Sequence, residues 1–266
     1  MGIDMEDFHT HTYLCEHAKG TPREYAASAF AKGLTTLGFS DHAPLPDGFR
    51  EGVTMHPHQV EEYLSMIEAV REEFRDKLNI RIGFEVDYPL RGSFDLKYMS
   101  DQRVDYLIGS CHYLQDWPFD HHDYTHEYEE RGIDAVYSDY YDTLAEIADS
   151  GLFNIIGHFD LTKKFGFRAQ ADMTAKIAHV AEAAARTSTA VEMNTSGLRK
   201  PVKEIYPAEN IVKILFEHNV PVTMGSDAHA PNEVGADFDK ASELLKKCGY
   251  RKIASFKKRK MTLLDL

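Results

Sequence analysis

Six short segments of the chain end an apolar run with side chains of the types that bind metal ions. They are Asp7-Phe8-His9-Thr10-His11, Ser40-Asp41-His42, Gly83-Phe84-Glu85-Val86-Asp87, Gly109-Ser110-Cys111-His112, Gly157-His158-Phe159-Asp160 and Gly225-Ser226-Asp227-Ala228-His229. One histidine after a strand is ordinary, whereas six such endings indicate a shared site. The strands of a barrel deliver their C-terminal residues to one rim, where the catalytic groups of such folds gather. The pattern therefore predicts a metalloenzyme with a multinuclear centre.

Two pairs of these side chains are separated by a single residue. His9 and His11 form the first pair, and Asp227 and His229 form the second. Residues i and i+2 of an extended strand face the same side, so both members of a pair can reach one cation. A lone pair of this kind is weak evidence, because surface and core histidines produce it too. Two pairs at strand ends, together with the other endings, favour the metal site.

Glu85 stands between Phe84 and Val86, and we interpret it as the only carboxylate embedded in an apolar strand. A buried ionised carboxylate is costly unless it is paired or bound to a metal. A core ion pair with Arg or Lys is one interpretation, and a carboxylate that bridges two metal ions is the favoured one. Asp87 faces the same side as Glu85 and is expected to support the site.

The remaining candidate ligands are histidines that follow strands or lie in the first loop. His42, His112 and His158 come after the second, fourth and fifth strands. His17 lies in the first loop, where Glu16 beside it competes for the same role. The histidines not expected to bind metal are His56, His58, His121, His122, His126, His179 and His218. Of these, His121, His122 and His126 crowd one polar loop and are expected to be exposed to solvent or to face the substrate.

Short apolar strands alternate with longer helical patterns, as in a parallel α/β sheet or barrel. The predicted strands are Met5–Phe8, Leu37–Phe39, Ile80–Val86, Tyr106–Ser110, Asn154–Gly157, Ala190–Met193, Val222–Gly225 and Ile253–Phe256. The first helix begins at Pro22 behind a Thr21 cap and stops at Gly33. Further helices are predicted at His58–Lys77, Tyr137–Ala148, Met173–Arg186, Ala208–His218 and Phe238–Lys247, and loops at Ala43–Pro57 and Tyr113–Arg131. We expect one domain over residues 1–266.

The composition limits which kinds of molecule the chain is expected to bind. The chain has 266 residues and a formal net charge of -13, which disfavours nucleic acid and membrane surfaces, since both are polyanions. The 3 cysteines show no disulfide pattern. No apolar run reaches the length of a membrane span and no signal peptide is evident, so a cytoplasmic protein is expected. A homo-oligomer is left open.

The ligand pattern His9-Thr10-His11, His42, Glu85, His112, His158 and Asp227-Ala228-His229 resembles the motifs of the PHP (polymerase and histidinol phosphatase) superfamily. The resemblance runs over nearly the whole chain and implies an α/β fold, a distorted (β/α)7 TIM-like barrel. It also implies two or three divalent metal ions, with Zn, Fe and Mn all suited to the imidazole and carboxylate ligands. One ion would take His9, His11, Glu85 and Asp227. A second would share Glu85 with His112 and His158, and a third would use His17, His42 and His229.

The flanking residues are similar to stand-alone histidinol-phosphate phosphatases. The similar segments are His9-Thr10-His11-Thr12, Cys15-Glu16-His17-Ala18, Gly20-Thr21-Pro22, Ser40-Asp41-His42-Ala43-Pro44 and Asn194-Thr195-Ser196-Gly197-Leu198-Arg199. This resemblance implies hydrolysis of L-histidinol phosphate, a small phosphorylated amino alcohol, to L-histidinol and inorganic phosphate in histidine biosynthesis.

In the implied reaction, a hydroxide between the cations bridged by Glu85 would attack phosphorus. The residues expected to act in catalysis are Glu85, Asp227, His42 and His229, and those expected to bind substrate are Arg168, Arg199, Ser196 and Lys164. A guanidinium grips phosphate oxygens in a bidentate way, which favours the two arginines, although surface ion pairs explain them equally well. The general acid is left unassigned.

Three other functions were weighed against this one. A PHP phosphoesterase acting on another mono- or diester, such as phosphotyrosine or a nucleotide, uses the same centre. A metal-stabilised binding module without catalysis is disfavoured, because every expected ligand position is filled. Amidohydrolase-like C–N hydrolysis also uses an H-x-H pair on a barrel, but that class typically has a bridging lysine where Glu85 stands here.

Overall fold

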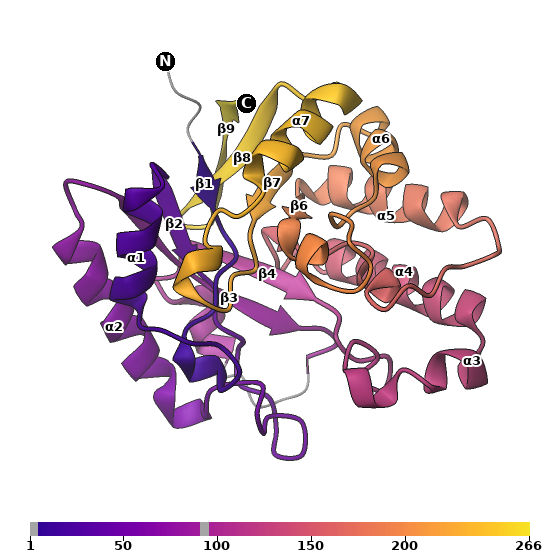
Figure 1. Ribbon diagram of the computed structural model, residues 1–266, viewed down its shortest axis with the longest axis horizontal. Helices are drawn as coiled ribbons and strands as arrows, with labels where there is room; N and C mark the ends of the chain where they lie inside the picture. The colour runs from indigo at the N-terminus through magenta and orange to yellow at the C-terminus, as the bar shows by residue number, and fades with distance from the viewer. Residues whose placement is uncertain (1–4, 91–95) are drawn as a thin grey trace.

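Seven parallel strands, each paired with the next along the chain, form the centre of the computed structural model, which describes residues 5–90 and 96–266 (Figure 1). The strands are β1 (Glu6–Asp7), β2 (Thr36–Phe39), β3 (Asn79–Asp87), β4 (Tyr106–Ser110), β5 (Ile155–Ile156), β6 (Ala190–Asn194) and β7 (Val222–Gly225). The seven barrel strands predicted from the sequence are therefore confirmed. The expected single domain over residues 1–266 includes residues 1–4 and 91–95, which lie outside the described residues.

Backbone hydrogen bonds between the first and last strands bring the two edges of the sheet together. The Phe8 amide donates to the Met224 carbonyl at 3.1 Å, and Thr10 forms a parallel bridge with Ala228. The sheet is thus a nearly closed barrel of seven strands, one fewer than the eight of a TIM barrel. This confirms the expected fold class.

Helices surround the barrel and connect successive strands (Figure 1). They are α1 (Pro22–Ala31), α2 (Val60–Glu73), α3 (Glu127–Arg131), α4 (Ile133–Asp149), α5 (Thr174–Thr187), α6 (Glu209–Glu217) and α7 (Phe238–Cys248). Short 3-10 helices span η1 (Tyr13–Cys15), η2 (Pro57–Gln59), η3 (Leu96–Ser100), η4 (His122–Tyr124), η5 (Leu161–Lys163), η6 (Thr195–Arg199) and η7 (Pro231–Glu233). The described part of the chain contains no helix long and apolar enough to cross a membrane.

The helix boundaries agree with the sequence prediction where a cap marks them. The Thr21 side chain caps α1 by accepting from the Glu24 amide, and the Glu24 carboxylate accepts from the Thr21 amide, as predicted. The prediction was wrong around Gly132. The segment predicted as a loop contains α3, and α4 begins at Ile133 rather than at Tyr137. Gly132, with a φ of 83°, interrupts the helical backbone between α3 and α4.

Aromatic rings fill the interior of the barrel. Tyr106 stacks edge-on against Phe8 with ring centroids 5.1 Å apart, and its hydroxyl donates to the Phe8 carbonyl at 2.7 Å. Gly38 and Gly83 make room for this ring, since a Cβ on either would lie 2.3 Å or 2.6 Å from Tyr106 atoms. The barrel is therefore a packed core, and its chemistry must lie at the rim.

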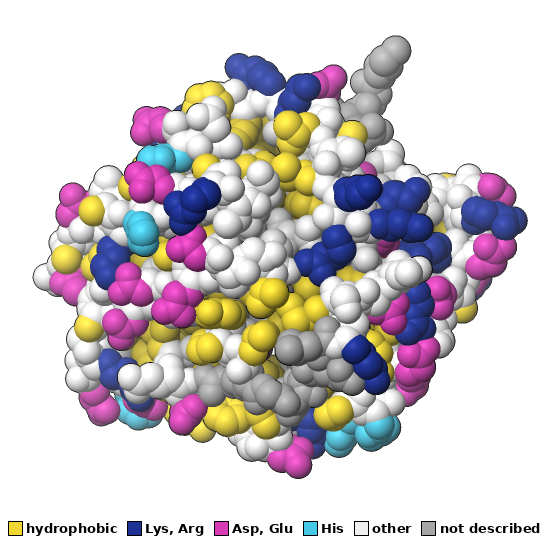
Figure 2. Space-filling view, turned by 180° about the vertical axis from the view of Figure 1, so that it is seen from behind, with side chains coloured by type: hydrophobic (Ala, Val, Ile, Leu, Met, Phe, Trp, Pro, Cys, Tyr) yellow, Lys and Arg dark blue, Asp and Glu magenta, His cyan; other side chains and the backbone are white. Residues whose placement is uncertain are grey.

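A hairpin packs against the barrel next to β1 and β7. It consists of β8 (Lys252–Lys257) and β9 (Lys260–Asp265), which pair antiparallel. Phe256 of β8 packs on Phe8, with ring centroids 5.6 Å apart. The sequence predicted β8 but missed β9, whose side chains are mostly exposed and carry no buried alternation. Seen from behind, Lys and Arg side chains gather at the upper right and a hydrophobic band crosses the lower half, so charge is spread unevenly over the surface (Figure 2).

Candidate metal centre

The C-terminal ends of the barrel strands bring the predicted ligand side chains into one cluster. His9 and His11 follow β1, His42 follows β2, and Glu85 lies near the end of β3. His112, His158 and the Asp227–His229 pair follow β4, β5 and β7. The sheet register aligns the cluster, because His42 forms a parallel bridge with Glu85 across the β2–β3 edge. Residues up to 220 positions apart thus meet at one rim.

Glu85 stands between two groups of ligand atoms. Its Oε2 lies 3.1 Å from His9 Nε2 and 3.4 Å from His11 Nε2. Its Oε1 lies 3.0 Å from His158 Nε2 and 3.5 Å from His112 Nε2. His42 Nδ1 also lies 3.2 Å from Oε2. The two carboxylate oxygens therefore face different sets of imidazoles, as a bridging carboxylate requires.

Asp227 completes the first of these groups. Its Oδ1 lies 3.3 Å from His11 Nε2 and 3.8 Å from His9 Nε2. Its other oxygen, Oδ2, accepts from the Ser196 hydroxyl at 2.9 Å. The first group thus offers imidazole and carboxylate donors around one point.

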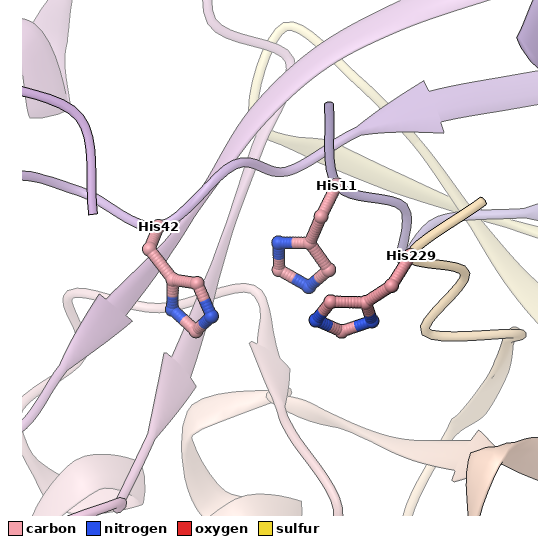
Figure 3. A group of neighbouring side chains, drawn as sticks. All are labelled: His11, His42 and His229. Atoms are coloured by element: carbon pink, nitrogen blue, oxygen red, sulfur yellow. The ribbon is translucent and has the colours of Figure 1, made fainter. Parts of the chain in front are cut away.

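Three further histidines lie beside the first group. His11, His42 and His229 point toward a common space, each from a different strand end (Figure 3). His17 Nε2 lies 2.9 Å from His229 Nε2. Glu16 turns away, since its carboxylate accepts from the Gly52 amide at 2.7 Å. The structure thus places His17, and not Glu16, in the cluster.

The spacing and the hydrogen bonding of these atoms fit divalent cations. Ligand atoms 2.0–2.2 Å from an ion at the tetrahedral angle lie about 3.3–3.6 Å apart, close to the separations around Glu85. His9 Nε2, His11 Nε2 and His42 Nδ1 are buried and have no hydrogen-bond partner among the described residues. Buried nitrogens without partners are costly unless a cation satisfies them. The donor set of imidazoles and carboxylates suits Zn, Fe or Mn.

Hydrogen bonds behind the rings fix which nitrogen faces the centre. His112 Nδ1 donates to Asp87 Oδ1 at 2.9 Å, so Asp87 contacts the ring of His112 rather than Glu85. His17 Nδ1 donates to the Cys15 carbonyl at 2.6 Å, and His229 Nδ1 donates to the Asp227 carbonyl at 3.0 Å. Because these oxygens only accept, each Nδ1 carries the hydrogen and each Nε2 keeps its lone pair for a cation.

Glu192 on β6 was missed, and the interpretation of Glu85 as the only strand-embedded carboxylate was wrong. Glu192 stands between Val191 and Met193 and is buried. Its Oε1 accepts from His9 Nδ1 at 2.6 Å. The signal that identified Glu85, a carboxylate inside an apolar strand, was also present at Glu192. No ligand-type residue two positions away drew attention to it.

Burial and neighbouring charges divide the histidines into two classes. Burial lowers the pKa of His11 and of His229 to about 3 and holds that of His42 well below its usual range. For His112, burial is outweighed by the Asp87 and Glu85 carboxylates, which raise its pKa to about 10. The pKa of His9 is raised in the same way, mainly by the Glu192 carboxylate.

The pKa values of Glu85 and Asp227, the two carboxylates of the cluster, are lowered, opposite to those of His9 and His112. Burial would raise the pKa of Glu85, but His9, His42 and His112 hold it well below its usual range. Burial likewise acts against the charge of Asp227, and His9 and His11 outweigh it. Both carboxylates are therefore ionised at neutral pH, as metal ligands must be.

A cavity of about 1010 Å³ opens over the cluster. Ser196, Lys164 and Lys200 line it together with Glu85, His158 and the other rim ligands. Lys164 is held by Asp120, whose Oδ2 accepts from its Nζ at 3.1 Å. The loop from β4 to α3 supplies aromatic and acidic walls, including Trp117, and space for a small organic group.

The structure does not place Arg168 and Arg199 among the residues that line this cavity. The Arg168 guanidinium is 47% exposed and pairs with Glu204 at 2.6 Å. Arg199 donates to the Ser226 carbonyl at 2.6 Å and lies 3.6 Å from Glu233. Each arginine has a nearer acceptor that draws it away. Of the predicted substrate-binding side chains, Ser196 and Lys164 are the ones that the structure brings to the cavity.

Comparison with known proteins agrees with this centre. The chain is 43% identical over 256 residues to a protein of Deinococcus radiodurans named probable histidinol-phosphatase, covering 96% of this chain and 97% of that one. It is 29% identical over 262 residues to a histidinol-phosphatase of Bacillus subtilis, covering 89% and 98%.

The fold is shared with a solved structure. The histidinol phosphate phosphatase of Lactococcus lactis, crystallised with zinc, L-histidinol and phosphate, superimposes with a TM-score of 0.82 at 21% identity, covering 98% of this chain and 100% of that one. The sequence model of the PHP domain matches residues 7–196, the segment that carries His9 through Ser196. The chain belongs to the PHP domain family.

Proposed function

We propose that the protein is a metal-dependent histidinol-phosphatase, which hydrolyses L-histidinol phosphate to L-histidinol and inorganic phosphate in histidine biosynthesis. The observation that carries the proposal is the convergence of imidazoles and carboxylates on the two oxygens of Glu85 at the floor of a cavity. The Deinococcus radiodurans relative, named as a probable histidinol-phosphatase, supports the choice of substrate. The ligands named for the Lactococcus lactis structure are consistent with it.

Two or three divalent ions would be held by the cluster. His9, His11, Glu85 and Asp227 would hold one ion, and Glu85, His112 and His158 a second. His17, His42 and His229 would hold the third. Divalent cations in these positions supply a water of lowered pKa and positive charge for the phosphoryl oxygens. The protein's part is to hold these donors in place and to seat the ester.

The cavity supplies the remaining groups for a phosphate monoester. Lys164 is fixed by Asp120, and Lys200 reaches the cavity beside His229, so both ammonium groups attract a phosphate dianion. Ser196 donates its hydroxyl hydrogen to Asp227, which leaves its oxygen lone pairs to accept from substrate or water. We propose Lys164, Lys200 and Ser196 as the substrate contacts, in place of Arg168 and Arg199.

Phosphate release from L-histidinol phosphate tests the proposal. Metal-loaded and chelator-stripped protein are compared on this ester, on para-nitrophenyl phosphate and on a dinucleotide. We expect fast, metal-dependent release from L-histidinol phosphate and slow release from the others. Metal-dependent activity on the other esters alone would remove the proposed substrate and keep the centre. Inactivity on all three with ions bound would overturn the phosphatase proposal.

A further inference from the structure

We propose that Glu192 is a positioning residue that links the two ion positions bridged by Glu85. It orients the ring of His9, a ligand of the first ion, and holds the backbone of His158, a ligand of the second. The inference rests on the metal centre of the proposed function and not on the identity of the substrate. It concerns a side chain that touches neither ion position directly.

Each oxygen of the Glu192 carboxylate contacts a different ligand residue. Oε1 accepts from His9 Nδ1 at 2.6 Å, and Oε2 accepts from the His158 amide at 3.0 Å. Oε2 also accepts from Asn194 Nδ2 at 3.1 Å. The side chain is 1% exposed, so water does not compete for these bonds.

The bond to His9 determines the tautomer of its ring. An ionised carboxylate only accepts hydrogen bonds, so His9 Nδ1 carries the hydrogen and Nε2 carries the lone pair. That Nε2 lies 3.1 Å from Glu85 Oε2 and has no hydrogen-bond partner among the described residues. A carboxylate behind a ligand histidine orients the ring and makes it a stronger donor to a metal.

The second oxygen reaches the other ion position through the backbone. The His158 amide that it holds begins the turn after β5, and the His158 ring places Nε2 3.0 Å from Glu85 Oε1. Asn194, also bonded to Glu192, donates to Asp227 Oδ2 at 3.3 Å. One carboxylate therefore restrains residues from the ends of three strands other than its own.

The space for this carboxylate is made by a glycine on the neighbouring strand. A Cβ on Gly225 would lie 1.8 Å from Glu192 Oε1 and 2.7 Å from His9 Cβ. Among the described residues, Glu192 has no Lys or Arg within ion-pair distance, and the ionisable side chain that it contacts is His9. A buried carboxylate without a permanent cation fits a role beside metal ions better than a structural ion pair.

Cobalt binding measures the proposed role without turnover. Metal-free wild-type protein, Glu192→Gln and Glu6→Gln are titrated with Co²⁺, followed by visible absorption and by competition with a chromophoric chelator. Glu6 is the matched control, since it is a buried glutamate whose Oε1 accepts from Thr36 Oγ1 at 2.6 Å, on the strand that leads to His9. Glutamine keeps one acceptor oxygen but meets the remaining donors with an amide NH₂.

We expect Glu192→Gln to weaken Co²⁺ binding by about 10–100-fold, the usual loss for a hydrogen-bond partner of a ligand, and to change the visible spectrum. Glu6→Gln should bind as the wild type does. Wild-type affinity and spectrum in Glu192→Gln would overturn the proposal, as would an equal loss in both variants.

Gly225→Ala tests the same contact from the other side, and it replaces Glu192→Gln if that variant does not fold. Its added methyl group displaces the carboxylate, so the same loss of Co²⁺ affinity is expected, and unchanged binding would count against the proposal. This experiment measures ion binding and not turnover. If the wild-type protein did not hydrolyse L-histidinol phosphate, the proposed substrate would be wrong, but the inference about Glu192 would still stand.

Discussion

The Nε2 atoms of His17 and His229 lie 2.9 Å apart, although the two residues are 212 positions apart in the sequence. Each ring donates its Nδ1 hydrogen to a backbone carbonyl, that of Cys15 or that of Asp227. Two lone pairs that face each other at this distance repel unless a cation lies between them. The pair is therefore a candidate position for an ion beside the one proposed for His11 and Asp227.

Replacement of His17 by Ala should remove this outer ion. We expect about one fewer metal ion per chain and a loss of activity of roughly 10–100-fold, since the ions bridged by Glu85 stay in place. Metal content after dialysis, measured by mass spectrometry, checks the first expectation. Glu16→Gln is the control, because Glu16 bonds to the Gly52 amide outside the cluster. An unchanged metal content in His17→Ala would contradict the assignment.

Glu85→Gln should be far more damaging. A carboxamide has one oxygen and cannot face two ions, so we expect kcat/KM to fall by at least about 10²-fold and both central ions to bind weakly. Steady-state phosphate release and metal content are measured together. Glu217→Gln, an exposed change on α6, should keep wild-type values. Retention of both ions in Glu85→Gln would refute the bridging role.

Ion binding should release protons in a predictable number. Carboxylates raise the pKa of His112 to about 10, so His112 is protonated at pH 8 before ions bind, and they raise the pKa of His9 above its usual range, so His9 holds a proton more readily than a free histidine. His11 and His229, with a pKa of about 3, are already neutral. We expect release of one proton from His112 and up to one more from His9 at pH 8, and an affinity that rises with pH up to about 10.

Calorimetric titration in two buffers of different ionisation enthalpy counts these protons. Asp87→Asn removes the main charge that raises the pKa of His112, so this variant should release about one proton fewer than the wild type when ions bind. An identical count in the wild type and in Asp87→Asn would contradict this account. In the metal-free protein, the stabilisation from protonated His112 is present below its unfolded pKa and is lost as pH rises through about 10.

Removal of the ions should lower thermal stability without unfolding the chain at room temperature. Ligand at 100 times its dissociation constant stabilises a protein by about 2.7 kcal/mol. At roughly 2–4 °C per kcal/mol for a chain of this size, chelation should lower the Tm by about 5–10 °C. Differential scanning calorimetry with chelator, and again after Zn²⁺ is restored, measures the shift. A Tm unaffected by chelator would mean that the cluster does not hold ions in the folded state.

The sequence located the rim ligands because each lies at the end of a predicted strand or within a few residues after it. Strand ends are visible as apolar runs, and parallel topology forces those ends together, so His9, Glu85 and Asp227 could be placed in one site without coordinates. Glu192 carries the same signal as Glu85, a carboxylate inside an apolar strand, but its role could not be assigned, since only the packing against Gly225 and His9 distinguishes a hydrogen-bond partner from a core ion pair.

The direction of a long side chain was the other quantity that sequence position did not determine. Arg199 and Lys200 are neighbours at the end of η6, yet Arg199 turns to the Ser226 carbonyl while Lys200 lines the cavity. Flexible cations go to the nearest unsatisfied acceptor, and that acceptor is known only after the chain folds. For β9, the strand pairing with β8 outweighed a sequence with no buried alternation.

The aromatic filling of the barrel bears on the turnover cycle. Because Phe8, Tyr106 and Phe256 occupy the interior below the ligands, the ester and both products pass through the mouth of the same cavity. With the phosphate of the proposed ester on the ligand cluster, we expect the freed alcohol to lie nearer that mouth and to leave first. Phosphate is then the last occupant and competes directly with the incoming ester. We therefore expect the rate of hydrolysis to fall as inorganic phosphate accumulates.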